Sequence, residues 1–339
     1  MLDTLTTVAL FLLLWFVAIV LYDVLFEGAY PWRVRRYRYS VTSPDGFVTE
    51  GLAANLRPPD GSFREKVCVV RLGFVAHWGV PNALDIMHQF QKALPAWTIF
   101  VPSPPGFGGT TYPVGHFPEG EVTFASFARA SMEGVIAEGA REVILVGASM
   151  GANIAAKEAR FLLEHSKVAR PVMLASFAGV IQKMEGDELR RRFLHPKGLV
   201  DRLAIKWWKR GVPLSTRIAT RGLIRAALHE TLWDIVLHRG RLALANMYQN
   251  MLADTELQED LLGLRGSGAL TFAIFGDRDR LTAEGHVAFA SEHPWTGVGH
   301  PWVGGLHNET HLGLCVDGRY QASVTKNLMR PRSDLSHTT

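Results

Sequence analysis

Short apolar runs alternate with helical patterns along most of this chain, and that alternation constrains its fold more than any other feature. Each strand-like run is apolar and bounded by Gly or Pro, as expected of strands covered on both faces. The pattern predicts a parallel, doubly wound sheet with right-handed crossovers. The predicted strands are Val67–Ala76, Trp97–Pro102, Glu142–Gly147, Pro171–Ala175, Leu270–Phe275 and Gly297–Val303, and the predicted helices are Ala83–Leu94, Phe124–Glu138, Ala152–Glu164, Ala283–Glu292 and Val316–Met329.

Two segments depart from this alternation. Residues 37–56 are interrupted by Pro44-Asp45-Gly46 and predict a hairpin ahead of the parallel strands. Residues 179–263 are helical in pattern and fall between the sixth and seventh predicted strands, so we expect them to form a cap. The predicted organisation is an N-terminal anchor (1–30), a first core part (31–178), the helical cap (179–263) and a second core part (264–339).

The N-terminal segment predicts one transmembrane helix. Residues 8–26 are apolar apart from Asp23 near their end, and about 20 apolar residues suffice for a helix to cross a bilayer. A basic cluster follows at Arg33, Arg35, Arg36 and Arg38, which by the positive-inside rule would keep the rest of the chain in the cytoplasm. A cleaved signal peptide would instead carry its basic residues before the apolar run.

The predicted cap is strongly basic. Residues 181–250 contain 14 Lys or Arg and 6 Asp or Glu, a difference of +8 against +4 for the whole chain. Trp207 and Trp208 end an amphipathic basic stretch, a combination typical of membrane interfaces. Two interpretations remain open: the cap presses on an anionic leaflet, or it is a solvated basic face around a buried lid. No nucleic-acid-binding motif accompanies the charge, so no nucleic-acid partner is expected.

A strand-to-helix turn supplies the candidate nucleophile. Residues 142–151 read EVILVGASMG, an apolar strand that leads into G-x-S-x-G and then into a helix of small residues. Ser149 would project at the helix N-terminus, where the dipole and the amide of Met150 favour a developing oxyanion. This placement on strand, turn and helix makes Ser149 a candidate catalytic serine.

With this motif the chain resembles the α/β-hydrolase superfamily, and the resemblance covers nearly everything after the anchor. In that superfamily the order along the chain is nucleophile, acid, histidine. The resemblance implies an acid after a late strand, and the G-x-x-D spacing of Gly276-Asp277-Arg278-Asp279 selects Asp279, with Asp277 as the alternative. It also implies a histidine after the last strand. His307, which follows Gly304-Gly305, is favoured over His311 and His300.

The resemblance further implies a second oxyanion-hole amide after the third strand. That loop reads Ala76-His77-Trp78-Gly79-Val80, with Trp where the family usually has Gly, and Trp78 or Gly79 would supply the amide beside that of Met150. Pro104–Gly109 matches the family's Pro-Gly-x-Gly turn, a marker of the fold without chemistry of its own.

The expected function is that of a membrane-anchored serine hydrolase. The resemblance implies a Ser149–His307–Asp279 triad that cleaves carboxylic esters through an acyl-enzyme. The Leu, Ile, Trp and Phe residues of the cap and the predicted anchor favour a small-molecule or lipid-like ester as substrate. No cofactor or metal is expected, because the chain has no phosphate-binding loop and its two cysteines, Cys68 and Cys315, are far apart. The alternatives are an acyltransferase or thioesterase with the same triad, or a non-catalytic binding module.

Overall fold

The computed structural model describes residues 7, 10, 36–73, 81–104, 110, 124–165, 168, 172–181, 257–279, 282–294, 302–307, 309 and 311–329. Its centre is an 8-stranded sheet in the order β1-β2-β4-β3-β5-β6-β7-β8. The first strands form an antiparallel hairpin, β2 pairs antiparallel with β4, and every later pair is parallel. The strands are β1 (Arg38–Thr42), β2 (Val48–Ala54), β3 (Lys66–Arg71), β4 (Thr98–Pro102), β5 (Glu142–Ala148), β6 (Met173–Phe177), β7 (Leu270–Gly276) and β8 (Trp302–Leu306).

The strand order reverses beside β3, and this reversal opens a place for a site. From β3 the chain crosses to β4 on one side, and from β4 it returns to β5 on the other side of β3. In open sheets of this kind, ligands bind in the crevice beyond the carboxyl ends of the strands at such a switch point. The candidate serine directly follows β5 and therefore lies at that end of the sheet.

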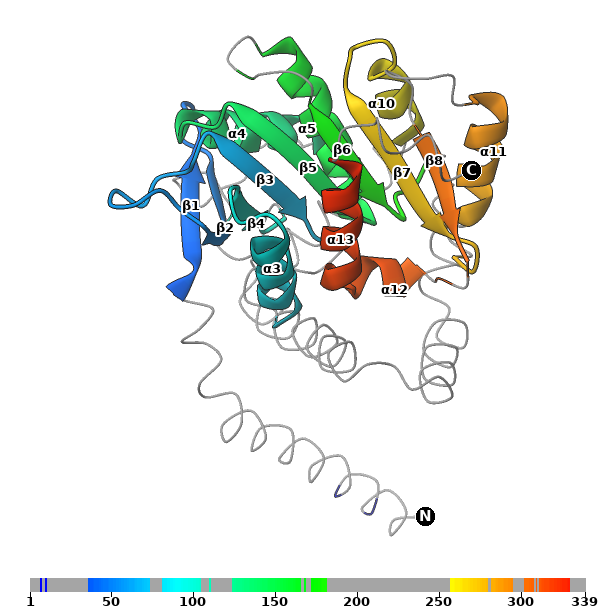
Figure 1. The fold of residues 1–339 in the computed structure, drawn as a ribbon, viewed down its shortest axis with the longest axis horizontal. Coiled ribbons are helices and arrows are strands. Elements are labelled where there is room, and N and C mark those ends of the chain that lie inside the picture. The colour runs from blue at the N-terminus through cyan, green and yellow to red at the C-terminus, as the bar shows by residue number, and fades with distance from the viewer. Residues whose placement is uncertain are drawn as a thin grey trace.

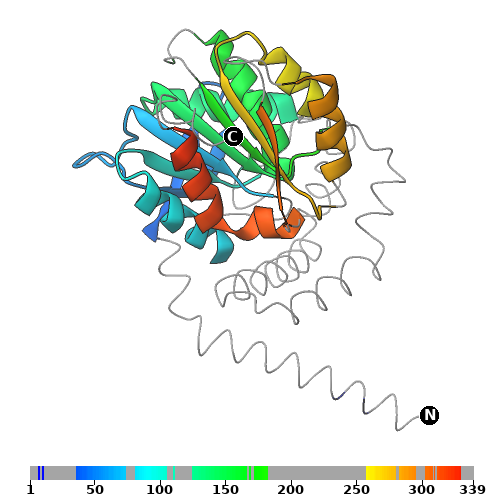
Figure 2. The same cartoon turned by 45° about the vertical axis from the view of Figure 1, so that its right-hand side comes forward.

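Helices cover both faces of the sheet, so the fold has three layers (Figures 1 and 2). One face carries α4, α5, α10 and α11, and the other carries α3 and α13. Figure 1 shows α12 at the end of the sheet toward which the arrow of β7 points. The helices are α3 (Pro81–Ala93), α4 (Phe124–Ala137), α5 (Met150–Glu164), α10 (Leu257–Gly263), α11 (Ala283–Glu292), α12 (His311–Val316) and α13 (Gly318–Leu328).

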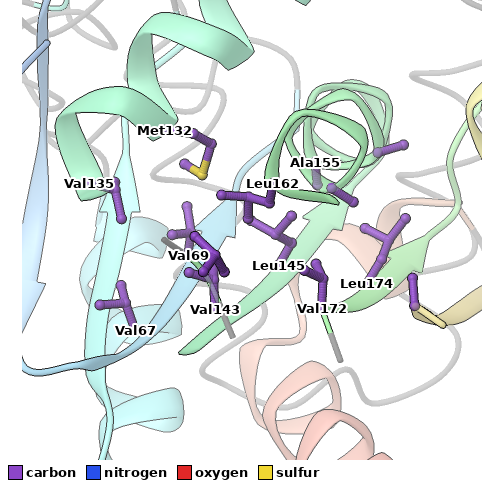
Figure 3. Packing of buried hydrophobic residues seen from close by; sticks show 14 of the residues in the cluster. Val67, Val69, Met132, Val135, Val143, Leu145, Ala155, Leu162, Val172 and Leu174 are labelled. Atoms are coloured by element: carbon purple, nitrogen blue, oxygen red, sulfur yellow. The ribbon is translucent and has the colours of Figure 1, made fainter. Parts of the chain in front are cut away.

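The packing between sheet and helices explains why the strands are apolar on both sides. Figure 3 shows Leu145 and Leu174 of the sheet beside Ala155 and Leu162 of α5, and all four are buried. Cys68, Val70 and their neighbours on alternate positions face the opposite layer. Burial of a Leu or Val side chain stabilises a fold by about 1.5–3 kcal/mol, so this double-sided burial is the main force that holds the sheet.

One ion pair is enclosed within this apolar layer. Arg71 at the end of β3 is 1% exposed and Glu158 of α5 is 0% exposed. Nε of Arg71 donates to Oε1 of Glu158 at 2.9 Å, and Nη2 donates to Oγ of Ser131 on α4 at 2.5 Å. The guanidinium also lies 4.7 Å from the ring centre of Phe127. These contacts connect β3 to α4 and to α5, the helix that begins directly after Ser149.

The insertion leaves and rejoins the core at one place. Leu257 donates from its amide to the carbonyl of Val180 at 3.0 Å, and Gln258 does so to Ile181 at 3.0 Å. Asn153 of α5 also holds both backbone polar groups of Val180, at 3.3 Å each. Helix α10, which the sequence grouped with the cap, packs on α5, and its Leu257 and Leu261 are in the core. Residues 182–256, the remainder of the predicted cap, lie outside the described residues.

The mostly parallel, doubly wound sheet and its hairpin are confirmed, and several element boundaries shift. The last strand runs from Trp302 to Leu306 and so ends three residues beyond the predicted Val303. The single helix predicted over 316–329 is preceded by a separate α12 from His311 to Val316.

The predicted transmembrane segment remains a prediction. Of residues 8–26, only Leu10 belongs to the described part of the chain. Among the helices that the structure does describe, none combines the length and apolar character that crossing a bilayer requires.

Candidate active site

Ser149 occupies a sharp turn between β5 and α5. Its backbone has φ 54° and ψ −124°, a left-handed conformation that costs a non-glycine residue of the order of 1–3 kcal/mol. The amide of Ser149 donates to the carbonyl of Phe177 at 2.9 Å, which fixes the turn to the end of β6. The side chain therefore projects from the carboxyl end of the sheet at the first residue before a helix.

The two glycines of the motif are required by close backbone contacts. A Cβ at Gly147 would lie 2.3 Å from the carbonyl oxygen of Gly151, and a Cβ at Gly151 would lie 2.4 Å from the carbonyl oxygens of Arg71 and Leu72. No side chain fits at such distances without a shift of backbone. The G-x-S-x-G pattern thus reflects the tight crossing of β5, α5 and β3 beneath the serine.

The loop after β7 places Asp279 in the same region. Asp279 is 1% exposed, and its amide donates to the carbonyl of Gly276 at 3.0 Å. A Cβ at Gly276 would lie 2.3 Å from the carbonyl oxygen of Glu309, so glycine is needed where this loop meets the loop after β8. The amide of Arg278 donates to that same carbonyl at 3.0 Å.

The histidine beside Ser149 is His311, the first residue of α12. Its Nε2 lies 2.9 Å from Oγ of Ser149, and its Nδ1 lies 2.9 Å from Oδ2 of Asp279. A carboxylate only accepts, so Nδ1 carries a proton and donates to Asp279. In the neutral ring Nε2 is then an acceptor for the hydroxyl proton of Ser149. The side chain of His311 is 22% exposed.

His307, the histidine that the sequence favoured, does not occupy this position. Its Nδ1 lies 2.9 Å from Oδ2 of Asp277, and its side chain is 85% exposed. The physical reason is the end of β8: the strand continues to Leu306, so His307 is the first residue after it and stays beside Asp277, at the end of β7. Further along, the carbonyl of Glu309 meets the loop after β7, and His311 reaches Ser149. The carboxylate that contacts His311 is that of Asp279, the acid that the sequence favoured, and Asp277 contacts His307.

The charges around His311 act on its basicity in opposite directions. Burial lowers the pKa of His311, but the Cys315 sulfur one helical turn away and the Asp279 carboxylate raise it well above its usual value. The ring is therefore a stronger base than a free imidazole, and it takes up a proton readily.

The structure describes only some of the remaining candidate residues, which are those of the oxyanion hole and His300. Met150 is the first residue of α5, where a backbone amide is free of intrahelical bonding and points along the helix dipole. Trp78, Gly79 and His300 lie outside the described residues, so the second oxyanion amide stays a prediction. Within the described ranges, no cluster of three or more His, Cys, Asp or Glu side chains is placed to hold a metal ion.

Fold and site together define the class of protein. The serine lies at a glycine-flanked turn, and the acid and histidine follow later strands of a mostly parallel 8-stranded sheet. The alpha/beta hydrolase family matches residues 73–310, and the chain belongs to it. No curated protein matches the chain in sequence at a significant level.

Solved structures of similar fold include hydrolases. A membrane phospholipase A, a bacterial virulence factor, has a TM-score of 0.58 at 19% identity and covers 96% of this chain and 98% of its own. A serine hydrolase of carbazole degradation has a TM-score of 0.55 at 16% identity and covers 86% and 98%. A 2-hydroxy-6-oxo-6-phenylhexa-2,4-dienoate hydrolase from Rhodococcus sp. strain RHA1 has a TM-score of 0.55 at 17% identity and covers 87% and 99%. At these identities the likeness is one of fold.

Proposed function

We propose that this protein is a serine hydrolase that cleaves carboxylic esters through an acyl-enzyme on Ser149. The observation that carries the proposal is the pair of 2.9 Å contacts that join His311 to Ser149 and to Asp279. This is the geometry in which a nucleophile, a base and an orienting acid act together. His311 takes the role of base that the sequence assigned to His307.

The proposed mechanism follows from these contacts. Neutral His311 removes the proton of Ser149 as its Oγ attacks the ester carbonyl, and the imidazolium then protonates the leaving alcohol. Asp279 keeps the Nδ1 proton in place and stabilises the imidazolium. The amide of Met150 donates to the oxyanion of the tetrahedral intermediate, and the loop that contains Trp78 and Gly79 supplies a second amide. Water then releases the acyl group by the same steps.

The proposed substrate is an apolar or lipid-like ester, and the proposed location is a membrane. Residues 8–26 would anchor the chain, the catalytic domain would face the cytoplasm, and the basic cap would contact anionic headgroups. The fold neighbour that is a membrane phospholipase A is consistent with a lipid substrate. The same triad would also serve a thioesterase or an acyltransferase, which differ from an esterase only in leaving group or acceptor.

Covalent labelling with a fluorophosphonate probe tests the proposal. Such a probe reacts with serines that a base activates, so the detergent-solubilised full chain should label, and Ser149→Ala should abolish labelling. His311→Ala should slow labelling by about 1,000-fold or more, the scale of a lost catalytic base in a triad.

The matched control is His307→Ala, which removes the other histidine of a His–Asp pair from the neighbouring loop. Because His307 is exposed and contacts Asp277 instead of Asp279, this variant should label at the rate of the wild type. Folded wild-type protein that fails to label would overturn the proposal and favour a binding module. Loss of labelling in His307→Ala alone would return the base to His307.

A further inference from the structure

Thr282 lies directly behind the carboxylate that orients His311. It precedes α11, is 3% exposed, and directs two donors at Asp279. The amide of Thr282 donates to Oδ1 at 3.2 Å, and its hydroxyl donates to Oδ2. Oδ2 also accepts from Nδ1 of His311, so one carboxylate oxygen is shared between Thr282 and the histidine.

Thr282 is itself held from the far side by His286. Nδ1 of His286 lies 2.8 Å from the carbonyl oxygen of Thr282, which only accepts, so Nδ1 carries the proton. The ring of His286 is 0% exposed and stacks on Phe275 of β7, with ring centres 5.0 Å apart and an interplanar angle of 26°. Thr282 is thus held on one side by His286, which stacks on Phe275, and on the other side by Asp279.

We infer that Thr282 is a positioning residue for the reaction, because its hydroxyl and amide hold the Asp279 carboxylate in the orientation that presents Oδ2 to His311. The inference rests on the proposed function and adds to it a side chain that never touches substrate. Free rotation of the carboxylate would turn Oδ2 away from Nδ1, and a hydrogen bond to a charged group is among the stronger ones in proteins.

The shared oxygen also lets Thr282 tune the histidine. By holding Oδ2 beside Nδ1, the hydroxyl keeps the negative charge of the carboxylate close to the proton at Nδ1. The titratable groups that face His311 are Asp279 after β7, Cys315 on α12 and His286 on α11. Removal of the Thr282 hydroxyl alters only the first of these: it frees the carboxylate to rotate, and the attraction of Asp279 for the imidazolium weakens.

Two substitutions separate the hydroxyl from the rest of the side chain. Thr282→Val keeps the shape and the backbone amide and removes only the hydroxyl, whereas Thr282→Ser keeps the hydroxyl and removes a methyl group. Thr271→Val is the matched control, because Thr271 lies at the opposite end of β7, is 4% exposed, and its hydroxyl has no partner among the described residues.

Steady-state hydrolysis of p-nitrophenyl butyrate and the rate of fluorophosphonate labelling, both measured against pH on the full solubilised chain, test the inference. Thr282→Val should lower kcat by about tenfold or more with little change in KM, the effect of one lost hydrogen bond to a charged group. It should also move the acid limb of kcat/KM and of labelling to lower pH, because the less well oriented carboxylate raises the pKa of His311 less. Thr282→Ser should recover most of kcat, and Thr271→Val should match the wild type.

The outcomes distinguish the inference from the function on which it rests. An active wild type with a Thr282→Val variant whose kcat and pH profile equal those of Thr271→Val would overturn the inference alone. An equal loss in Thr282→Ser and Thr282→Val would also overturn it, because the methyl group and its packing would then account for the effect. A wild type that neither turns over nor labels would overturn the proposed function and the inference together.

Discussion

His286 is a histidine that the protein keeps neutral in its interior. Burial lowers the pKa of His286 to about 4 from 6.5, against the opposing attraction of Asp279. Its Nε2 is buried and has no hydrogen-bond partner among the described residues, so a proton there would be an unsolvated charge. The unfolded chain has no such constraint and takes up a proton near pH 6.5.

This difference predicts a loss of stability in acid. Because the folded pKa of His286 is below the unfolded one, its neutral form contributes fully above pH 6.5, and that contribution is lost as the pH falls from 6.5 to about 4. The full loss is about 3 kcal/mol. His286→Asn keeps a donor near the position of Nδ1 but cannot titrate. Its free energy of unfolding should therefore fall less steeply over this range, as measured by chemical denaturation at several pH values.

The control is His88→Asn, the same exchange at a half-buried position of α3 on the other face of the sheet. If His286→Asn loses stability between pH 6.5 and 4 as steeply as the wild type and the control do, the protonation of His286 is not what destabilises the fold in acid.

At this scale the sequence predicts some residues and not others. Ser149 could be predicted because its two flanking glycines are a local demand of one turn. Asp279 could be predicted because Gly276 fixes where its loop begins. The choice between His307 and His311 could not, because it depends on where β8 ends, and the Gly-Gly pair inside that strand resembled the start of a loop. The contact of Thr282 with Asp279 could not be predicted either, because a Thr directly before a helix is also a common N-cap residue.

At the scale of elements, the buried Arg71–Glu158 pair connects the strand before the predicted oxyanion loop to the nucleophile helix. Nη1 of Arg71 and Oε2 of Glu158 have no partner in the described part of the chain, so the pair is incompletely satisfied. Burial raises the pKa of Glu158, while the guanidinium of Arg71 opposes that rise. Buried ion pairs contribute little net stability, yet loss of one partner leaves the other charge buried and unpaired in the core.

A double-mutant cycle tests whether an unpaired buried charge is what makes the loss of Arg71 or Glu158 costly. Glu158→Leu alone should destabilise the fold by about 3–5 kcal/mol, because it leaves the Arg71 charge buried and unpaired. The double variant Arg71→Met/Glu158→Leu should be much less destabilised than the sum of its two single variants, since neither charge remains. Midpoints of urea unfolding for the four proteins measure the coupling. Single-variant losses that simply add would contradict the buried charge as the cause.

The sequence predicts most elements and misses their long-range partners. Apolar runs bounded by Gly or Pro located the strands, because burial on both faces leaves a local signature. Arg71 ends such a run, and nothing near it indicates a carboxylate 87 residues away. Likewise α10 reads as part of a helical insertion, and only its contacts with α5, including Asp260 with Lys157 at 2.9 Å, show that it belongs to the core.

At the scale of the whole molecule, the site and the predicted anchor depend on different interactions: packing of the core for the site, and partition into a bilayer for the anchor. The core is held by two apolar layers on either side of the sheet, and it carries Ser149, His311 and Asp279. The proposed anchor would act by partition of residues 8–26 into hydrocarbon, which is insensitive to salt. The proposed contact of the basic cap with a leaflet is electrostatic and weakens as ions screen it.

Removal of residues 1–30 separates these two attachments. The full chain should stay with the membrane fraction in high salt and at alkaline pH, because a spanning helix leaves only with detergent. The chain that begins at residue 31 should lose that resistance and retain only binding to vesicles with anionic lipid, lost at about 0.5 M salt, where the Debye length falls to a few ångströms. Fluorophosphonate labelling of the shortened chain checks that its site is intact. A shortened chain that labels and still resists salt would contradict residues 8–26 as the anchor.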